Sequence, residues 1–175
     1  MKSEIKDLIV YLDSEDFDEK NIAIIEVASL LEMNTYILNG GKDPSRLEEY
    51  KIYLDEDLIS IRLDIEEQAE IIDELINRIR AKDELSSSML WAIGKGRPEA
   101  GLVRLVETIT ACWDEFNDEE AYQSIISMEN YMDYDVRKTL SKEEEIIRFL
   151  KSKSEAVDQR LWEVAKRVLS KLLKV

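Results

Sequence analysis

Three carboxylates recur at helical spacing in the middle of the chain and are its best candidates for metal chemistry. Glu67, Glu70 and Asp73 stand three residues apart, so a helix would place them on one face. Mg²⁺ prefers carboxylate oxygens, and such a face could serve a magnesium-dependent, all-α nucleotide phosphohydrolase. That chemistry needs carboxylates from a second helix, and the nearest downstream Glu-x-x-Asp, Glu115 to Asp118, ends its own helix. We therefore expect a solvated acidic face without metal, and we keep the phosphohydrolase as an alternative.

The chain has no histidine, which removes several reaction classes. Ser-His and Cys-His nucleophilic catalysis, His-ligated zinc, haem with a proximal histidine and Glu-x-x-His di-iron sites all need that side chain. The single cysteine, Cys112, cannot form a disulfide within the chain and falls in an apolar helical run, which favours a buried, unreactive thiol. We predict a protein that is not an enzyme and that carries no cofactor.

Two short motifs are similar to ligand-binding loops but have simpler interpretations. The acidic run from Asp13 to Asp18 is similar to the start of a calcium loop, yet Phe17 occupies a ligand position and the turn glycine is missing. We expect a turn with a helix N-cap. Gly94-Lys95-Gly96-Arg97 could bind phosphate, but the spacing of a P-loop is absent, so a helix is expected to end at Gly94.

The aromatic and basic stripes of the chain favour packing over binding. Trp91, Trp113 and Trp162 lie within apolar stripes and are expected in the core. The last helical segment is basic opposite its leucines and valines, so it could touch a membrane surface or an acidic partner. We prefer the interpretation that these cations balance the acidic body and suit the C-terminal end of a helix.

Charge is unevenly distributed along the chain. Residues 136–175 hold 11 Lys and Arg against 6 Asp and Glu, whereas residues 1–135 hold 13 against 33. The acidic body repels phosphates, so direct nucleic-acid binding is not expected, and a basic protein partner suits it. The candidate contacts are acidic clusters at two expected helix-pair turns: Glu15, Asp16, Asp18 and Glu19 in one, and Asp114, Glu115, Asp118, Glu119 and Glu120 in the other.

Helix-capping patterns occur along most of the chain and predict an all-α fold. Only 5 Gly and 2 Pro leave little room for tight β turns. We expect about eight antiparallel helices in a single domain, residues 1–175, with an internal break at 39–44. The N-terminal capping patterns are Asp16 with Glu19, Asp43 with Pro44, Asn117 with Glu120, and Ser141 with Glu144; Pro98 is placed at a further helix start.

The segment 47–79 has two interpretations. Its apolar side chains recur three, four or seven residues apart, which predicts one long helix or two abutting helices. The alternative is a helical bundle with one β-hairpin near 50–65, because 50–54 and 58–63 alternate in part and Asp55-Glu56-Asp57 could turn between them. The helical spacing continues to Arg80, which favours helix.

The segment from Met89 to Val106 resembles the junction between consecutive HEAT or HEAT-like repeats. In that family an apolar second helix ends in glycine and a proline-containing turn starts the next helix, and Gly94 and Pro98 stand at those places here. A further unit is similar over 145–172, with Val157-Asp158-Gln159-Arg160 where the family carries a valine and a basic residue. The resemblance covers about half of the chain and omits 40–80. It implies an irregular HEAT-like array.

Together these features favour a noncatalytic protein-protein interaction module that binds a basic partner. An immunity or inhibitor protein, matched to a basic toxin or nucleic-acid enzyme, is the sharper version, and a structural subunit of a larger complex is a further alternative. No stretch approaches the ~18 to 20 uncharged apolar residues that span a bilayer. The N-terminus becomes acidic where a signal peptide would become apolar, so we expect a cytoplasmic location without membrane contact. The sequence carries no signal for an oligomeric state.

Overall fold

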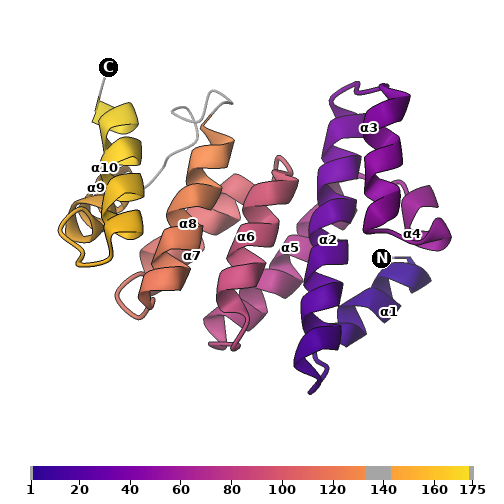
Figure 1. The fold of residues 1–175 in the computed structure, drawn as a ribbon, viewed down its shortest axis with the longest axis horizontal. Coiled ribbons are helices and arrows are strands. Elements are labelled where there is room, and N and C mark those ends of the chain that lie inside the picture. Colours follow the sequence, from indigo (N-terminus) through magenta and orange to yellow (C-terminus); the bar gives the residue numbers. More distant parts are fainter. Residues whose placement is uncertain (1, 133–142, 174–175) are drawn as a thin grey trace.

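The chain is helical throughout the part that the structure describes. The computed structural model describes residues 2–132 and 143–173, and within them every regular element is a helix (Figure 1). The all-α class is therefore confirmed. The elements are α1 (Ser3–Tyr11), α2 (Phe17–Leu38), α3 (Pro44–Glu49), the 3₁₀-helix η1 (Tyr50–Ile52), α4 (Glu56–Ser60), α5 (Ile65–Arg80), α6 (Ser86–Gly96), α7 (Gly101–Cys112), α8 (Asp118–Tyr131), α9 (Glu143–Lys153) and α10 (Gln159–Leu173).

Short polar side chains start the helices at most of the places where the sequence predicts a cap. Asp16 and Asp43 each accept a hydrogen bond from the backbone N–H two residues later, at 2.9 and 3.0 Å. Asn117 and Glu120 form a reciprocal capping box, with each side chain bonded to the other residue's N–H at 2.9 Å. These bonds satisfy N–H groups that a helix leaves unpaired at its start. The pattern at Ser141 lies outside the described residues.

The helices form two layers (Figure 1). In one layer α2, α6, α8 and α10 stand side by side, each packed on the next. Behind them α5, α7 and α9 form a second row, and α1 packs on α2 at the N-terminal end. Consecutive helices of the two layers pair as antiparallel hairpins, and the buried side chains form one continuous cluster from Ile5 to Leu172. This arrangement brings the turns inside successive pairs to one edge of the molecule.

The segment between α2 and α5 differs from both sequence interpretations. The β-hairpin alternative is wrong, and so is the long helix, because α3, η1 and α4 are short helices followed by an extended connection. Asp55 breaks the helical run by accepting a bond from the N–H of Leu58 at 2.8 Å, which starts α4. The buried side chain of Asn34 then holds the extended backbone, since its Oδ1 accepts the N–H of Leu63 at 2.8 Å. These short elements raise the described helices to ten α-helices and one 3₁₀-helix, where about eight were expected.

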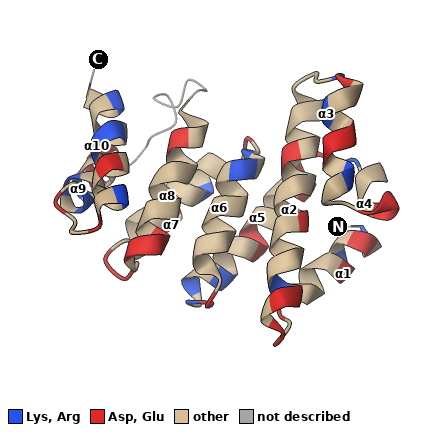
Figure 2. Cartoon of the chain, in the orientation of Figure 1, with Lys and Arg blue, Asp and Glu red and all other residues tan. Residues whose placement is uncertain are grey.

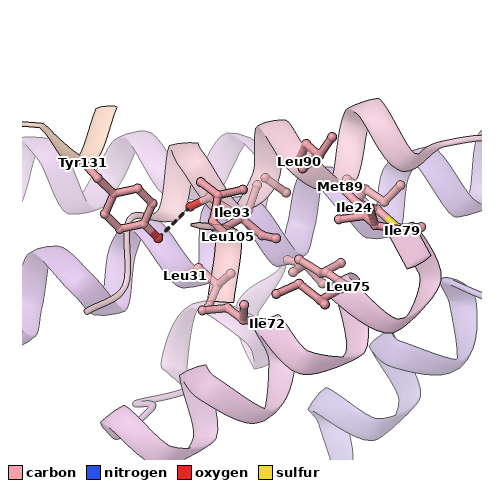
Figure 3. Close-up of a cluster of buried hydrophobic side chains, with 14 of the residues drawn as sticks. Ile24, Leu31, Ile72, Leu75, Ile79, Met89, Leu90, Ile93, Leu105 and Tyr131 are labelled. Atoms are coloured by element: carbon pink, nitrogen blue, oxygen red, sulfur yellow. Dashed lines mark hydrogen bonds between the residues drawn. The ribbon is translucent and has the colours of Figure 1, made fainter. Parts of the chain in front are cut away.

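Helix α6 lies between α2 and α8 and approaches both closely through glycines. A Cβ on Gly94 would stand 2.5 Å from the Cα of Ser127 in α8, and one on Gly96 would stand 2.5 Å from the Cβ of Leu31 in α2. The hydroxyl of Tyr131 donates to the Ile93 carbonyl at 3.3 Å across the same contact (Figure 3). The glycines therefore set the spacing between neighbouring helices, and Gly94 lies within α6 rather than at its end.

The end of α6 corrects two boundary predictions. The helix continues past Gly94 to Gly96, and its C-cap is Arg97, which adopts a left-handed conformation with φ 47°. Pro98 does not start α7, which begins three residues later at Gly101. Left-handed backbone is usual at this position, but glycine is the residue that adopts it without strain. The turn between α6 and α7 therefore lies further along the chain than the sequence predicts.

Helix α2 is the most apolar of the long helices. Among the described helices it alone is long and apolar enough to cross a membrane, by length and composition only. Half of its most apolar window is buried inside the fold, against neighbouring helices.

Candidate functional site

The first predicted acidic cluster lies at the α1–α2 turn and is divided between structural and free carboxylates. Asp16 is committed to capping α2, and Glu19 accepts a hydrogen bond from the Ser14 hydroxyl at 2.8 Å. Glu15 and Asp18 are exposed, and their side chains contact no cation within the described residues. The structure thus leaves two of the four carboxylates available to another molecule.

The second predicted cluster lies at the α7–α8 turn and is divided in the same way. Glu120 belongs to the capping box, Glu115 pairs with Lys82 at 3.0 Å, and Glu119 pairs with Arg160 at 3.3 Å. Asp114 and Asp118 are exposed and have no side-chain partner in the described part of the chain. Each cluster therefore presents two unpaired carboxylates beside the start of a helix, where the helix dipole stabilises negative charge.

Both clusters lie on the same edge of the array. We call it the turn edge and define it by residues 12–19, 81–85 and 113–120 (Figure 1). Figure 2 shows acidic residues at this end of α2 and of α8, with basic residues near the α5–α6 turn between them. Lys20, which is 8% exposed, ties α2 to this central turn through Asp83 at 3.1 Å. The edge is therefore acidic at two places that are separated by a mixed-charge turn.

The acidic face of α5 is occupied by intramolecular contacts. Glu67 accepts from Lys2 at 2.6 Å and also closes a capping box with Asp64. Asp73 is paired with Arg104 of α7 through two contacts, at 2.6 and 3.1 Å. Among the described residues no group of three or more His, Cys, Asp or Glu side chains could hold a metal ion. Glu67 and Asp73 thus hold other parts of the fold in place.

The two motifs that are similar to ligand-binding loops have structural roles. Asp13 forms a bidentate pair with Arg78 of α5, at 2.9 and 2.7 Å, and Asp16 caps α2, so the calcium-like run is a turn with an N-cap as expected. Gly94 and Gly96 are buried in helix packing, which leaves no open glycine loop for a phosphate. Helix packing therefore accounts for both glycines of this motif. The predicted helix end at Gly94 is wrong.

The tryptophans and the cysteine are less uniformly buried than the sequence suggests. Trp113 packs on the core with its ring centroid 6.0 Å from that of Phe149, and Trp91 is partly buried against the core. Trp162 is 37% exposed, so its prediction as a core residue is wrong, and Lys166 lies 4.0 Å from the centroid of its ring. Cys112 ends α7 and is only partly buried, and this burial raises the pKa of its thiol, which lowers its reactivity.

The basic last helix balances charge within the fold. Arg167 and Lys171 of α10 both pair with Glu129 of α8, at 2.6 and 2.7 Å. The hydrogen bond from Arg167, followed by that from Lys171, lowers the pKa of Glu129 against the effect of burial. This contact fits the interpretation that the cations of the tail neutralise the acidic body.

Helices α3, η1 and α4 form an insertion between α2 and α5, and sequence reasoning missed a polar groove between α2, the α3–η1 part of this insertion and the end of α6. The groove has a volume of about 600 Å³, and Glu32 lies in its wall between Arg46 at 3.9 Å and Lys95 at 3.3 Å. Two rings flank the Lys95 ammonium group, with centroids 5.7 Å away for Tyr53 and 5.5 Å for Trp91. The residues come from distant segments, so only the Asp43-Pro44 helix start signalled part of the groove in the sequence.

Comparison with protein-family models, with curated proteins and with solved structures gives no significant match to this chain.

Proposed function

We propose that the chain is a noncatalytic protein-binding module whose turn edge contacts a basic protein. An immunity or inhibitor protein that covers a basic toxin or nucleic-acid enzyme is the sharper form of this proposal. The observation that carries it is the placement of Glu15, Asp18, Asp114 and Asp118, which are exposed, unpaired and on one edge. Local structure explains the other members of the clusters as caps and ion pairs, but it does not use these four.

Electrostatics supports a basic partner over a neutral one. The chain carries a net charge of −15, and four of the carboxylates that contribute to it are unpaired on one edge, where they add to the repulsion that the folded state must overcome. Lysines or arginines of a partner would relieve that repulsion and would also steer the encounter. The HEAT-like resemblance adds only an analogy, since helical arrays commonly bind proteins through their surfaces.

Affinity capture with a matched pair of variants tests the proposal. The bait is the whole chain, and the test variant carries Glu15→Gln, Asp18→Asn, Asp114→Asn and Asp118→Asn. We expect the wild type to retain basic proteins, which mass spectrometry identifies, and the test variant to lose them. Raised salt should release the same proteins from the wild type. The control neutralises four exposed carboxylates away from the edge, Glu66, Glu99, Glu107 and Glu144, by Gln replacement.

The control distinguishes a surface from bulk charge, because both variants change the net charge equally. Loss of the same proteins from both variants would point to nonspecific attraction, and retention by both would remove the turn edge from the proposal. Selective loss from the test variant alone supports a specific acidic edge.

A further inference from the structure

We infer that a second surface, the insertion knob formed by Ile52 and Tyr53, binds a segment of the same basic partner that carries an apolar side chain between lysines or arginines. This inference rests on the proposed function, because it concerns the same partner. Ile52 is 77% exposed and Tyr53 is 48% exposed, although both are large apolar side chains. Adjacent exposed residues of this kind, rimmed by charge, are typical of protein contact sites.

The knob is held rigidly by the residues on either side of it. Tyr50 and Leu54 are buried, at 5% and 4% exposure, so the chain is anchored immediately before and after the exposed pair. The N–H of Tyr53 and that of Leu54 both donate to the Tyr50 carbonyl, at 3.0 and 2.9 Å. A contact residue that is already fixed loses little conformational entropy on binding. The exposure of Ile52 and Tyr53 is therefore a property of a fixed turn.

The groove beside the knob provides a preorganised wall. Tyr53 belongs both to the knob and to the wall, where its ring faces the Lys95 ammonium group. Arg46 lies 4.5 Å from the centroid of the Tyr36 ring and near Glu32, so the polar groups of the wall are already placed by contacts within the fold. A side chain of the partner that enters the groove would meet Ile52 and Tyr53 together with the charged groups of the wall.

Charge around the knob selects the chemistry of the partner. Residues 43–57 contain six acidic side chains against two basic ones, and Lys51 is already paired with Glu48 at 2.7 Å. Figure 2 shows acidic residues on both α3 and α4. Burial raises the pKa of Glu26 in α2, and repulsion from Asp55 of this segment adds to that rise. An apolar knob inside an acidic rim is complementary to apolar side chains flanked by lysine or arginine.

Two-dimensional NMR of the whole chain with synthetic peptides tests this inference. The probe peptide has Leu-Phe at its centre and lysines on both sides. One control peptide replaces Leu-Phe with Ser-Ser, and another replaces the lysines with glutamates. We expect the probe alone to shift backbone signals of residues 50–56 and 91–96, because binding needs both the apolar centre and the positive flanks.

The insertion and the turn edge lie in different parts of the molecule, so the location of the shifts separates the two proposals (Figure 1). Shifts confined to the turn edge, or equal effects of the Leu-Phe and Ser-Ser peptides, would overturn the insertion knob while leaving the proposed function intact. The absence of shifts at the insertion with every peptide would overturn it too. The turn edge is judged separately by the capture experiment.

A double variant gives a second measurement. Ile52→Ser with Tyr53→Ser removes the exposed apolar surface without touching the buried Tyr50 and Leu54, and we expect roughly tenfold weaker binding of the Leu-Phe peptide. The matched control is Val157→Ser, which removes a fully exposed apolar side chain elsewhere. The Val157→Ser variant should bind the Leu-Phe peptide with the same affinity as the wild type. Equal affinities for the double variant and the wild type would contradict the inference.

Discussion

Gly94 and Ser127 lie so close across the α6–α8 contact that a Cβ on Gly94 would stand 2.5 Å from the Ser127 Cα. The Ser127 hydroxyl also donates to the Leu90 carbonyl at 2.7 Å, so a side chain of α8 bonds to the backbone of α6. Because α6 packs on both α2 and α8, this contact fixes the centre of the front layer. The close approach of α6 to α8 therefore requires a residue without a side chain at position 94.

Gly94→Ala is expected to lower the free energy of unfolding by about 1–3 kcal/mol. Alanine is the better helix former, but the added methyl group meets backbone and Cβ atoms of Ser127 that cannot rotate away, and overpacking of this kind costs more than the gain. Urea unfolding followed by circular dichroism measures the difference. The control is Ser88→Ala in the same helix, which is only partly buried and should stay within about 0.5 kcal/mol of the wild type. A Gly94→Ala variant as stable as the wild type would show that α6 and α8 lie further apart than the structure places them.

Arg97→Gly is expected to raise the free energy of unfolding by about 0.5–1 kcal/mol. Arg97 ends α6 with φ 47°, a conformation that glycine adopts without the strain of a Cβ. Thermal melting of the two proteins under the same conditions measures the gain. Arg97→Ala serves as the control, because it removes the same side chain but keeps the Cβ, and it should not stabilise. Equal melting temperatures for the glycine and alanine variants would contradict a strained cap.

Capping was the part of the fold that the sequence predicted best. The bonds at Asp16, Asp43 and Asn117 form within a few residues of each other, so their pattern is complete in a short window of sequence. The all-α class follows from the same local signals. Helix ends were predicted less well: Gly94 suggested the end of a helix, but it lies inside α6, where Ser127 of another helix occupies the space of a Cβ.

The insertion was not predicted because two local caps, at Asp55 and Asp64, act together with a long-range contact. Apolar spacing over 47–79 suits a long helix. However, the buried side chain of Asn34 accepts a hydrogen bond from the Leu63 N–H, and this bond stabilises an extended connection. No local sequence pattern within the segment predicts the hydrogen bond between Leu63 and Asn34. The groove at Glu32 and Lys95 was missed for the same reason, since its walls come from three separated segments. The acidic turns were found because carboxylates gather there in sequence, but only the structure divides them into paired and unpaired groups.

Magnesium is expected to leave the melting temperature unchanged. The carboxylates that could bind it on α5 are engaged, Glu67 with Lys2 and Asp73 with Arg104. A cation would have to displace both basic side chains before it gained two ligands. Thermal melting with and without about 10 mM MgCl₂ measures this, with CaCl₂ as a parallel series and NaCl of equal ionic strength as the control. A rise in melting temperature that depends on the divalent cation would revive the phosphohydrolase alternative.

Glu129→Gln is expected to destabilise the protein near neutral pH and to lose this effect in acid. Arg167 and Lys171 lower the pKa of Glu129 from its ordinary value of 4.5, so the folded state favours the charged carboxylate. Stability from a lowered pKa is present above the unfolded value and is lost as pH falls through the folded one. Because both cations are half-exposed and screened by solvent, the expected difference is about 1 kcal/mol at pH 7.

Denaturant unfolding of the Glu129→Gln variant and the wild type at about pH 7 and about pH 3 measures this change. The two free energies should approach each other in acid, because protonation of Glu129 removes from the wild type the charge that glutamine removes from the variant. Glu144→Gln is the control, since Glu144 is exposed in the first turn of α9 and contacts neither cation. A difference that stays constant between the two pH values would mean that the contact between α8 and α10 gains its stability from packing rather than from the charged triad.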